Sequence, residues 1–197
     1  MPRYTREIRV EAPFDDVWAF HSTIDGLEAL TPSFMNLVVE SVTGPDGLAD
    51  PDVLEAGARI DLAMQPAGIT PRQRWTSVIT ERERDGGQGM FRDVMEDGPF
   101  PRWVHTHRFE AQDSATIVRD QLEYSLPYVG GLFGPLGNWV GFEPMFRYRH
   151  RQTRALLEWR GWRSGGWAAV RRKKETPRPG RPLQRRGQWI PSASICS

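Results

Sequence analysis

The chain alternates apolar and polar residues over most of its first 126 positions, which is typical of β-strands with one buried face. Turn residues separate these runs, for example at 44–47 and 85–87. The strand candidates cover residues 4–10, 36–42, 58–65, 73–84, 89–96, 103–110 and 116–126. The pattern therefore predicts a first strand followed by a run of about six antiparallel strands.

Helical spacing of apolar residues occurs in three places. Pro13 opens a short helix with an apolar stripe that ends at His21, and residues 24–30 predict a second short helix. A long stripe runs over 136–157, where Pro144 either kinks the helix or starts a new one. The simplest architecture is an α+β fold, in which a curved antiparallel sheet wraps around the long C-terminal helix and two short helices follow the first strand.

Charge divides the chain into two parts. Residues 1–162 contain 17 Arg, no Lys and 24 acidic residues, a net charge of −7. Residues 163–197 contain nine basic residues and one acidic residue, a net charge of +8. We therefore expect a folded domain over 1–160 and a separate basic segment over 161–197.

The basic segment has two interpretations. Its Arg and Lys cluster at 171–174, followed by Pro177 and Pro179, is typical of a disordered arm that contacts anionic surfaces. Alternatively, hydrophobic periodicity vanishes there and the acidic bias reverses, as in a shifted reading frame of a GC-rich gene. The sequence leaves both open.

Several classes of protein are disfavoured. No apolar run approaches the roughly 20 residues of a membrane span, and no leader-like segment precedes the first strand, so we expect a cytoplasmic protein. The single cysteine, Cys196, lies in the basic segment, so 1–160 can form no internal disulfide. No phosphate-binding loop, nucleophile motif or paired-carboxylate spacing is present, and we expect no cofactor.

The candidate chemistry is concentrated in the strand at 103–110. Trp103, His105, His107 and Phe109 share one face of this strand. Two imidazoles between two aromatic rings suit the wall of a pocket for a small organic molecule. The spacing of His105 and His107 also permits a metal site, but the sequence places no third ligand, and we expect no metal.

Acid–base chemistry is a further hypothesis for these histidines. His105 or His107 could act as a base together with Asp93 or Tyr124. The simpler interpretation, which we favour, is that Asp93 and Arg119 form an ion pair across neighbouring strands.

Arginines at 147, 149, 151 and 154 give the long helix a basic character. Such a helix can bind nucleic acid or anionic lipid, but a solvated face balanced by the acidic domain is the simpler interpretation. We therefore expect no nucleic-acid partner for residues 1–160.

Three patches resemble the START-like helix-grip (SRPBCC) superfamily, in its bacterial and archaeal cyclase/dehydrase-like ligand-binding branch. They are Glu7-Ile8-Arg9-Val10-Glu11-Ala12-Pro13-Phe14-Asp15-Asp16-Val17-Trp18, then Phe91-Arg92-Asp93 with Gly98-Pro99-Phe100 and Trp103-x-His105-x-His107-x-Phe109, and finally Leu122-x-Tyr124-x-Leu126-Pro127 with Met145-Phe146-Arg147-Tyr148-Arg149-His150-Arg151. The resemblance spans about 1–160 and implies the helix-grip fold. It leaves function open, because one fold serves many functions.

The resemblance implies an internal cavity for a small hydrophobic or amphipathic ligand, such as a lipid, an isoprenoid or a polyketide-like compound. The expected lining residues are Trp75, Phe91, Trp103, His105, His107, Tyr124 and Phe146. One alternative is a polyketide cyclase/dehydrase-type enzyme that uses the same pocket with a histidine base, for which His105, His107 and Asp93 are the candidates. Another is an interaction protein with a filled interior.

Overall fold

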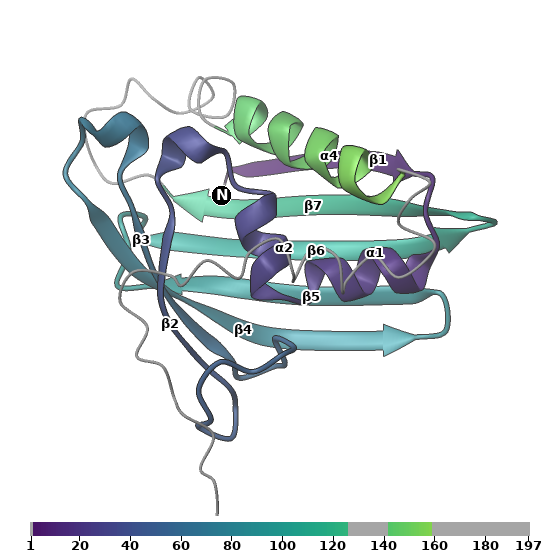
Figure 1. The fold of residues 1–197 in the computed structure, drawn as a ribbon, viewed down its shortest axis with the longest axis horizontal. Coiled ribbons are helices and arrows are strands. Elements are labelled where there is room, and N and C mark those ends of the chain that lie inside the picture. Colours follow the sequence, from purple (N-terminus) through teal and green to yellow (C-terminus); the bar gives the residue numbers. More distant parts are fainter. Residues whose placement is uncertain (1, 126–141, 159–197) are drawn as a thin grey trace, which may run out of the picture. The chain divides into compact units, whose positions relative to one another are not determined.

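Seven antiparallel strands form one curled sheet with helices against its inner face (Figure 1). The structure is a computed structural model that describes residues 2–125 and 142–158. The strands are β1 (Arg3–Val10), β2 (Val38–Thr43), β3 (Arg59–Met64), β4 (Gln73–Asp85), β5 (Gln88–Glu96), β6 (Arg102–Gln112) and β7 (Ala115–Ser125). Each strand predicted from alternation is present.

The order of the strands across the sheet is β1-β7-β6-β5-β4-β3-β2. Neighbours from β2 to β7 are therefore consecutive in the chain, and only β1 pairs with a strand distant in sequence, β7. Register shifts interrupt the β2–β3 pair between Val39 and Ser41 and the β4–β5 pair between Ile79 and Glu81. Such bulges bend strands and increase their twist, which favours the curl of the sheet.

Two short helices connect β1 to the rest of the sheet. They are α1 (Phe14–His21) and α2 (Ile24–Ala29), and the side chain of Thr23 accepts a hydrogen bond from the Gly26 amide to cap α2. Single 3-10 turns follow at η1 (Ser33–Met35) and η2 (Pro66–Gly68), which the hydrophobic pattern does not predict. Helix α1 lies along the sheet over β5 and β6 (Figure 1).

The long C-terminal helix α4 (Glu143–Leu157) lies beside β1. Pro144 occupies its first turn, where the missing amide hydrogen sacrifices no helical hydrogen bond. Glu143 fixes this end of α4 to β1, since its carboxylate accepts hydrogen bonds of 2.5 Å from both Tyr4 Oη and Arg6 Nη1. The stretch 136–141, where the helical stripe begins, lies outside the described residues.

Aromatic side chains pack between α1 and the sheet. Trp18 of α1 packs edge-on against Phe109 and Phe91, and it passes so close to β5 that a Cβ at Gly89 would lie 2.7 Å from the indole. The architecture confirms the predicted α+β helix-grip fold. The expected basic segment at 161–197 lies outside the described residues and stays a prediction. None of the helices at 14–29 or 143–157 is long and apolar enough to cross a membrane.

Candidate functional site

A cavity of about 180 Å³ lies between the inner face of the sheet and the helices α2 and α4. Most of its wall is apolar, and this part includes Leu27 of α2, Leu30 directly after that helix, Ile60 and Leu62 of β3, and Trp75 and Ile79 of β4. The polar residues of the wall are His21, Thr31, Ser77, Asp93, His105, His107 and Arg149. The cavity therefore combines a large apolar surface with a few convergent polar groups, which is typical of small-molecule sites.

Six of the seven residues expected to line a pocket do so. They are Trp75, Phe91, Trp103, His105, His107 and Phe146, and Asp93 lines the cavity beside them. Tyr124 does not: it is fully buried in a cluster with Tyr4, Leu122, Phe142 and Phe146, where its ring lies 4.7 Å from that of Phe142. Whether the six bind a ligand stays a prediction.

Two carboxylates enclose the paired imidazoles of β6. Asp93 comes from β5, directly opposite His105, and Asp120 comes from β7, directly opposite His107. His105 Nε2 lies 3.0 Å and His107 Nδ1 2.8 Å from Asp120 Oδ1. On the cavity side, Asp93 Oδ2 lies 3.3 Å from His107 Nε2 and 3.7 Å from His105 Nδ1. Each imidazole thus lies between two acidic groups.

A third histidine completes this cluster from the helix. His150 of α4 reaches Asp120 Oδ2 through Nε2 at 2.6 Å, and both residues are buried. The carboxylate of Asp120 therefore contacts one nitrogen atom of each of three imidazoles. Sequence reasoning did not select Asp120, although an acidic residue at an inward position between Val118 and Leu122 was a usable signal.

Two opposing effects set the pKa values of the cluster: burial disfavours the charged form of each group, and a neighbour of opposite charge favours it. Burial disfavours the charge on Asp120, yet His107 and the hydrogen bonds from the histidines keep the pKa of Asp120 well below its usual value. The pKa of Asp93 is lowered in the same way, because His107 and His105 outweigh its burial. Burial lowers the pKa of His105, whereas the two carboxylates outweigh burial and raise the pKa of His107.

The expected ion pair between Asp93 and Arg119 is wrong. Arg119 points to the outer face of β7 and pairs with Glu7 of β1 at 2.5 Å, whereas Asp93 faces inward and contacts Ser77 and the histidines. The solvated basic face expected on α4 also needs correction at one position. Arg149 lines the cavity, so it is not part of that face.

His21 makes the stability of the fold sensitive to acid. His21 is buried, and its Nδ1–H donates a hydrogen bond of 2.8 Å to the Val17 carbonyl. Burial, together with the positive charge of Arg149, lowers the pKa of His21 to about 3. His107 also lowers this pKa, whereas Asp120 raises it. Because the unfolded chain takes up a proton near pH 6.5 and the folded chain does not, stability is expected to fall from pH 6.5 downward by a little over 1 kcal/mol per pH unit.

The substitution His21→Leu isolates this effect in urea-unfolding experiments between pH 5 and 8. The unfolding free energy of the wild type should decline more steeply than that of the variant below pH 6.5, and the two should run parallel above pH 7.5. The two proteins differ only at residue 21, so the difference between their curves reports on His21. Parallel curves over the whole range would contradict the assignment.

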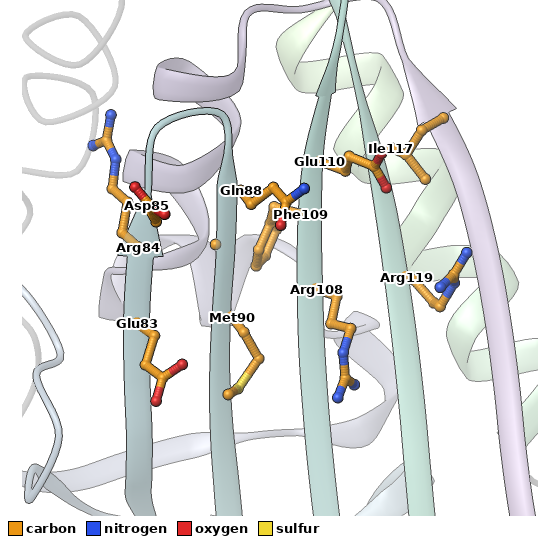
Figure 2. Close-up of a pocket in the computed structure, with 11 residues that line it drawn as sticks. Glu83, Arg84, Asp85, Gln88, Met90, Arg108, Phe109, Glu110, Ile117 and Arg119 are labelled. Carbon is orange, nitrogen blue, oxygen red and sulfur yellow. The ribbon is translucent and has the colours of Figure 1, made fainter.

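A second hollow lies on the opposite face of the sheet. Met90 and Arg108 of this hollow (Figure 2) alternate along β5 and β6 with Phe91 and His107, which line the inner cavity. Charged side chains dominate it, including Glu83, Arg84, Asp85, Arg108, Glu110 and Arg119. Although this hollow is larger, at about 310 Å³, it lacks an extended apolar wall, so we assign the candidate site to the inner cavity.

Several solved structures share this fold. They include a START superfamily protein from Mycobacterium smegmatis, which is 10% identical, with a TM-score of 0.52 over 79% of this chain and 97% of that chain. Ginseng major latex-like protein 151 from Panax ginseng is 10% identical, with a TM-score of 0.53 over 79% and 97% of the two chains. A protein from Chromobacterium violaceum is 14% identical, with a TM-score of 0.54 over 79% and 96%. These likenesses show that the chain has the helix-grip fold.

The family follows from the sequence match. Residues 10–151 match the family described as polyketide cyclase / dehydrase and lipid transport, and the chain belongs to this family. No curated protein matches the chain. The family and the fold together establish a hydrophobic ligand-binding fold, as the resemblance of the three sequence patches implied.

Proposed function

We propose that this protein binds one small amphipathic molecule in its inner cavity, with the apolar part against β3, β4 and α2 and an oxygen-bearing group at the polar end. The observation that carries the proposal is the division of the cavity wall. Leu62, Trp75 and Ile79 supply apolar surface, while Asp93, His105 and His107 converge at one place. Burial of apolar area contributes about 25 cal/mol per Å², and the polar groups fix orientation.

The volume of the cavity limits the size of the ligand. A dry cavity of roughly 150 Å³ holds a molecule of the size of benzene. At about 180 Å³ this cavity suits a compact ligand with one or two rings, of the isoprenoid or polyketide-like kind, better than a long-chain lipid. Open space of this size also argues against an interaction protein with a filled interior.

Arg149 adds a cationic donor to the polar end. Arg149 lines the cavity, and its positive charge contributes to lowering the pKa of Asp93. A guanidinium only donates hydrogen bonds. A ligand with a carbonyl, enolate or carboxylate oxygen therefore fits this end better than a hydrocarbon does. We expect such a ligand to be met in the cytoplasm.

Native mass spectrometry of the full chain purified without detergent tests the proposal, followed by extraction and identification of the bound molecule. Leu62→Trp fills the cavity from β3 and should remove the bound mass or weaken binding at least tenfold. Leu48→Trp introduces the same side chain at an exposed position and should bind as the wild type does. A wild type that stays ligand-free against a panel of small amphipathic compounds, or equal binding by both variants, would refute the proposal.

A cyclase/dehydrase-type enzyme is the second candidate. It is favoured by the contact of His107 Nε2 with Asp93 Oδ2 at the cavity wall, where a base could take a proton from a bound carbonyl compound. Asp93→Asn separates the two functions once a ligand is known. An enzyme would lose turnover and keep binding, whereas a carrier would convert nothing in either form.

A further inference from the structure

Three ligand atoms converge at the polar end of the cavity. Asp93, His105 and His107 each offer one atom, and the three atoms lie within 4.8 Å of one another. Asp93 Oδ2 is 3.3 Å from His107 Nε2 and 3.7 Å from His105 Nδ1. Two ligands bound to one zinc ion at about 2.0 Å in tetrahedral geometry are separated by little more than 3 Å, so small side-chain movements would bring all three onto one ion.

The remaining nitrogens of both histidines face a second carboxylate. His105 Nε2 and His107 Nδ1 lie 3.0 Å and 2.8 Å from Asp120 Oδ1, and Ser77 Oγ donates to Asp93 Oδ1 at 3.3 Å. Metal-binding histidines nearly always donate their second ring N–H to a carboxylate, a carbonyl or water, which fixes the ring and its tautomer. Asp120 orients the His105 ring in this way, whereas His107 Nδ1 lies close to Asp120 without hydrogen-bond geometry.

One N–H on each imidazole satisfies the hydrogen bonds of this cluster. His105 Nε2 bonds to Asp120 Oδ1 at 3.0 Å, and His107 Nε2 bonds to Asp93 Oδ2 at 3.3 Å. His105 Nδ1 lies 3.7 Å from Asp93 Oδ2, which is beyond hydrogen-bonding distance, so this nitrogen has a lone pair available for a cation held by Asp93. At His107 a cation on Nε2 would shift the proton to Nδ1, a buried nitrogen that lacks a hydrogen-bond partner among the described residues and lies 2.8 Å from Asp120 Oδ1.

We propose that Asp93, His105 and His107 bind a divalent first-row transition-metal ion, with zinc as the first candidate. Two imidazoles and one carboxylate suit zinc or iron(II) better than magnesium or calcium, which prefer oxygen ligands alone. Three protein ligands leave coordination positions for water or for a ligand from the cavity. One consequence of this inference rests on the proposed function: the oxygen of the molecule bound in the cavity would occupy an open coordination position on the metal.

Cobalt(II) and zinc(II) alone are the probes, added to the full chain after removal of metal with a chelator. The chain has only four histidines and one cysteine, so competing sites are few. We expect one cobalt per chain with visible d–d absorption, displaced by zinc. Asp93→Asn should weaken binding at least tenfold, because it removes a ligand. His150→Gln is the matched control, since His150 contacts Asp120 but is not among the proposed ligands, and Cys196→Ser should also bind normally.

Failure to bind either ion stoichiometrically at neutral pH would refute the inference, as would equal binding by Asp93→Asn and the wild type. If Asp93→Asn does not fold, X-ray absorption of the zinc-loaded wild type decides, because fewer than two imidazole ligands would also refute the inference. Ligand retention measured on the metal-free protein is a separate result. Retention without any metal binding would support the proposed function and overturn only the metal site.

Discussion

Asp120→Asn is expected to lower the free energy of unfolding by about 3–5 kcal/mol, because it removes the charge that holds three buried imidazoles. His105, His107 and His150 all lie within 3.0 Å of the Asp120 carboxylate, whose side chain is 2% exposed. An asparagine keeps the shape of the side chain but offers one acceptor oxygen and an amide group that donates. At least one histidine is then left facing a donor inside the protein, which is costly.

Urea unfolding at pH 7.5 in the presence of a chelator measures this effect without any contribution from bound metal. Glu123→Gln is the matched control on the same strand. Its side chain is 26% exposed and pairs with Arg3, which is 60% exposed, so we expect a loss below about 1 kcal/mol. Equal stability of the two variants would show that Asp120 does not organise the cluster.

Phe146→Ala is expected to cost about 3–5 kcal/mol of unfolding free energy, because it empties the contact between α4 and the sheet. Phe146 is fully buried, and its ring centroid lies 5.1 Å from that of Tyr4 and 5.3 Å from that of His105. The loss combines the transfer of a large apolar side chain to water with a cavity that a helix against a sheet cannot close completely.

The same substitution at Phe34 provides the control. Phe34 is 59% exposed, so Phe34→Ala should change the unfolding free energy by less than about 0.5 kcal/mol in the same urea experiment. A loss at Phe146 no larger than the loss at Phe34 would mean that α4 is not held to the sheet by this side chain.

Alternation along the chain was enough to predict the strands and the inward direction of His105 and His107. The prediction succeeded because one face of the sheet is buried. A change of one residue in strand register would turn the apolar side chains of that strand toward solvent. The same alternation also fixes the faces of Asp120 and Arg119. Asp120 shares the inward set of β7 with Leu122, and Arg119 falls on the outward set, which already excludes Arg119 from pairing with the inward Asp93.

Other features depended on contacts that no local pattern encodes. Tyr124 is inward and aromatic like the lining residues, but only the three-dimensional structure shows that Phe142 covers it. His150 was visible within a helical stripe, yet its approach to Asp120 requires α4 to lie across β7 at one particular rotation. The 3-10 turn at η2 contains Ala67 at a φ of 52°, a backbone conformation that alanine rarely adopts and that composition does not predict.

The unequal distribution of polar atoms around the cavity has a consequence for selectivity. Asp93, His105, His107 and Arg149 meet one end of a bound molecule, while Leu62 and Ile60 on β3 meet the apolar remainder. Compounds of identical size and polarity would then differ in affinity according to where their oxygen is attached. The site would act as a regiochemical filter that separates positional isomers, and a panel of such isomers would reveal the carbon skeleton of the natural ligand before its identity is known.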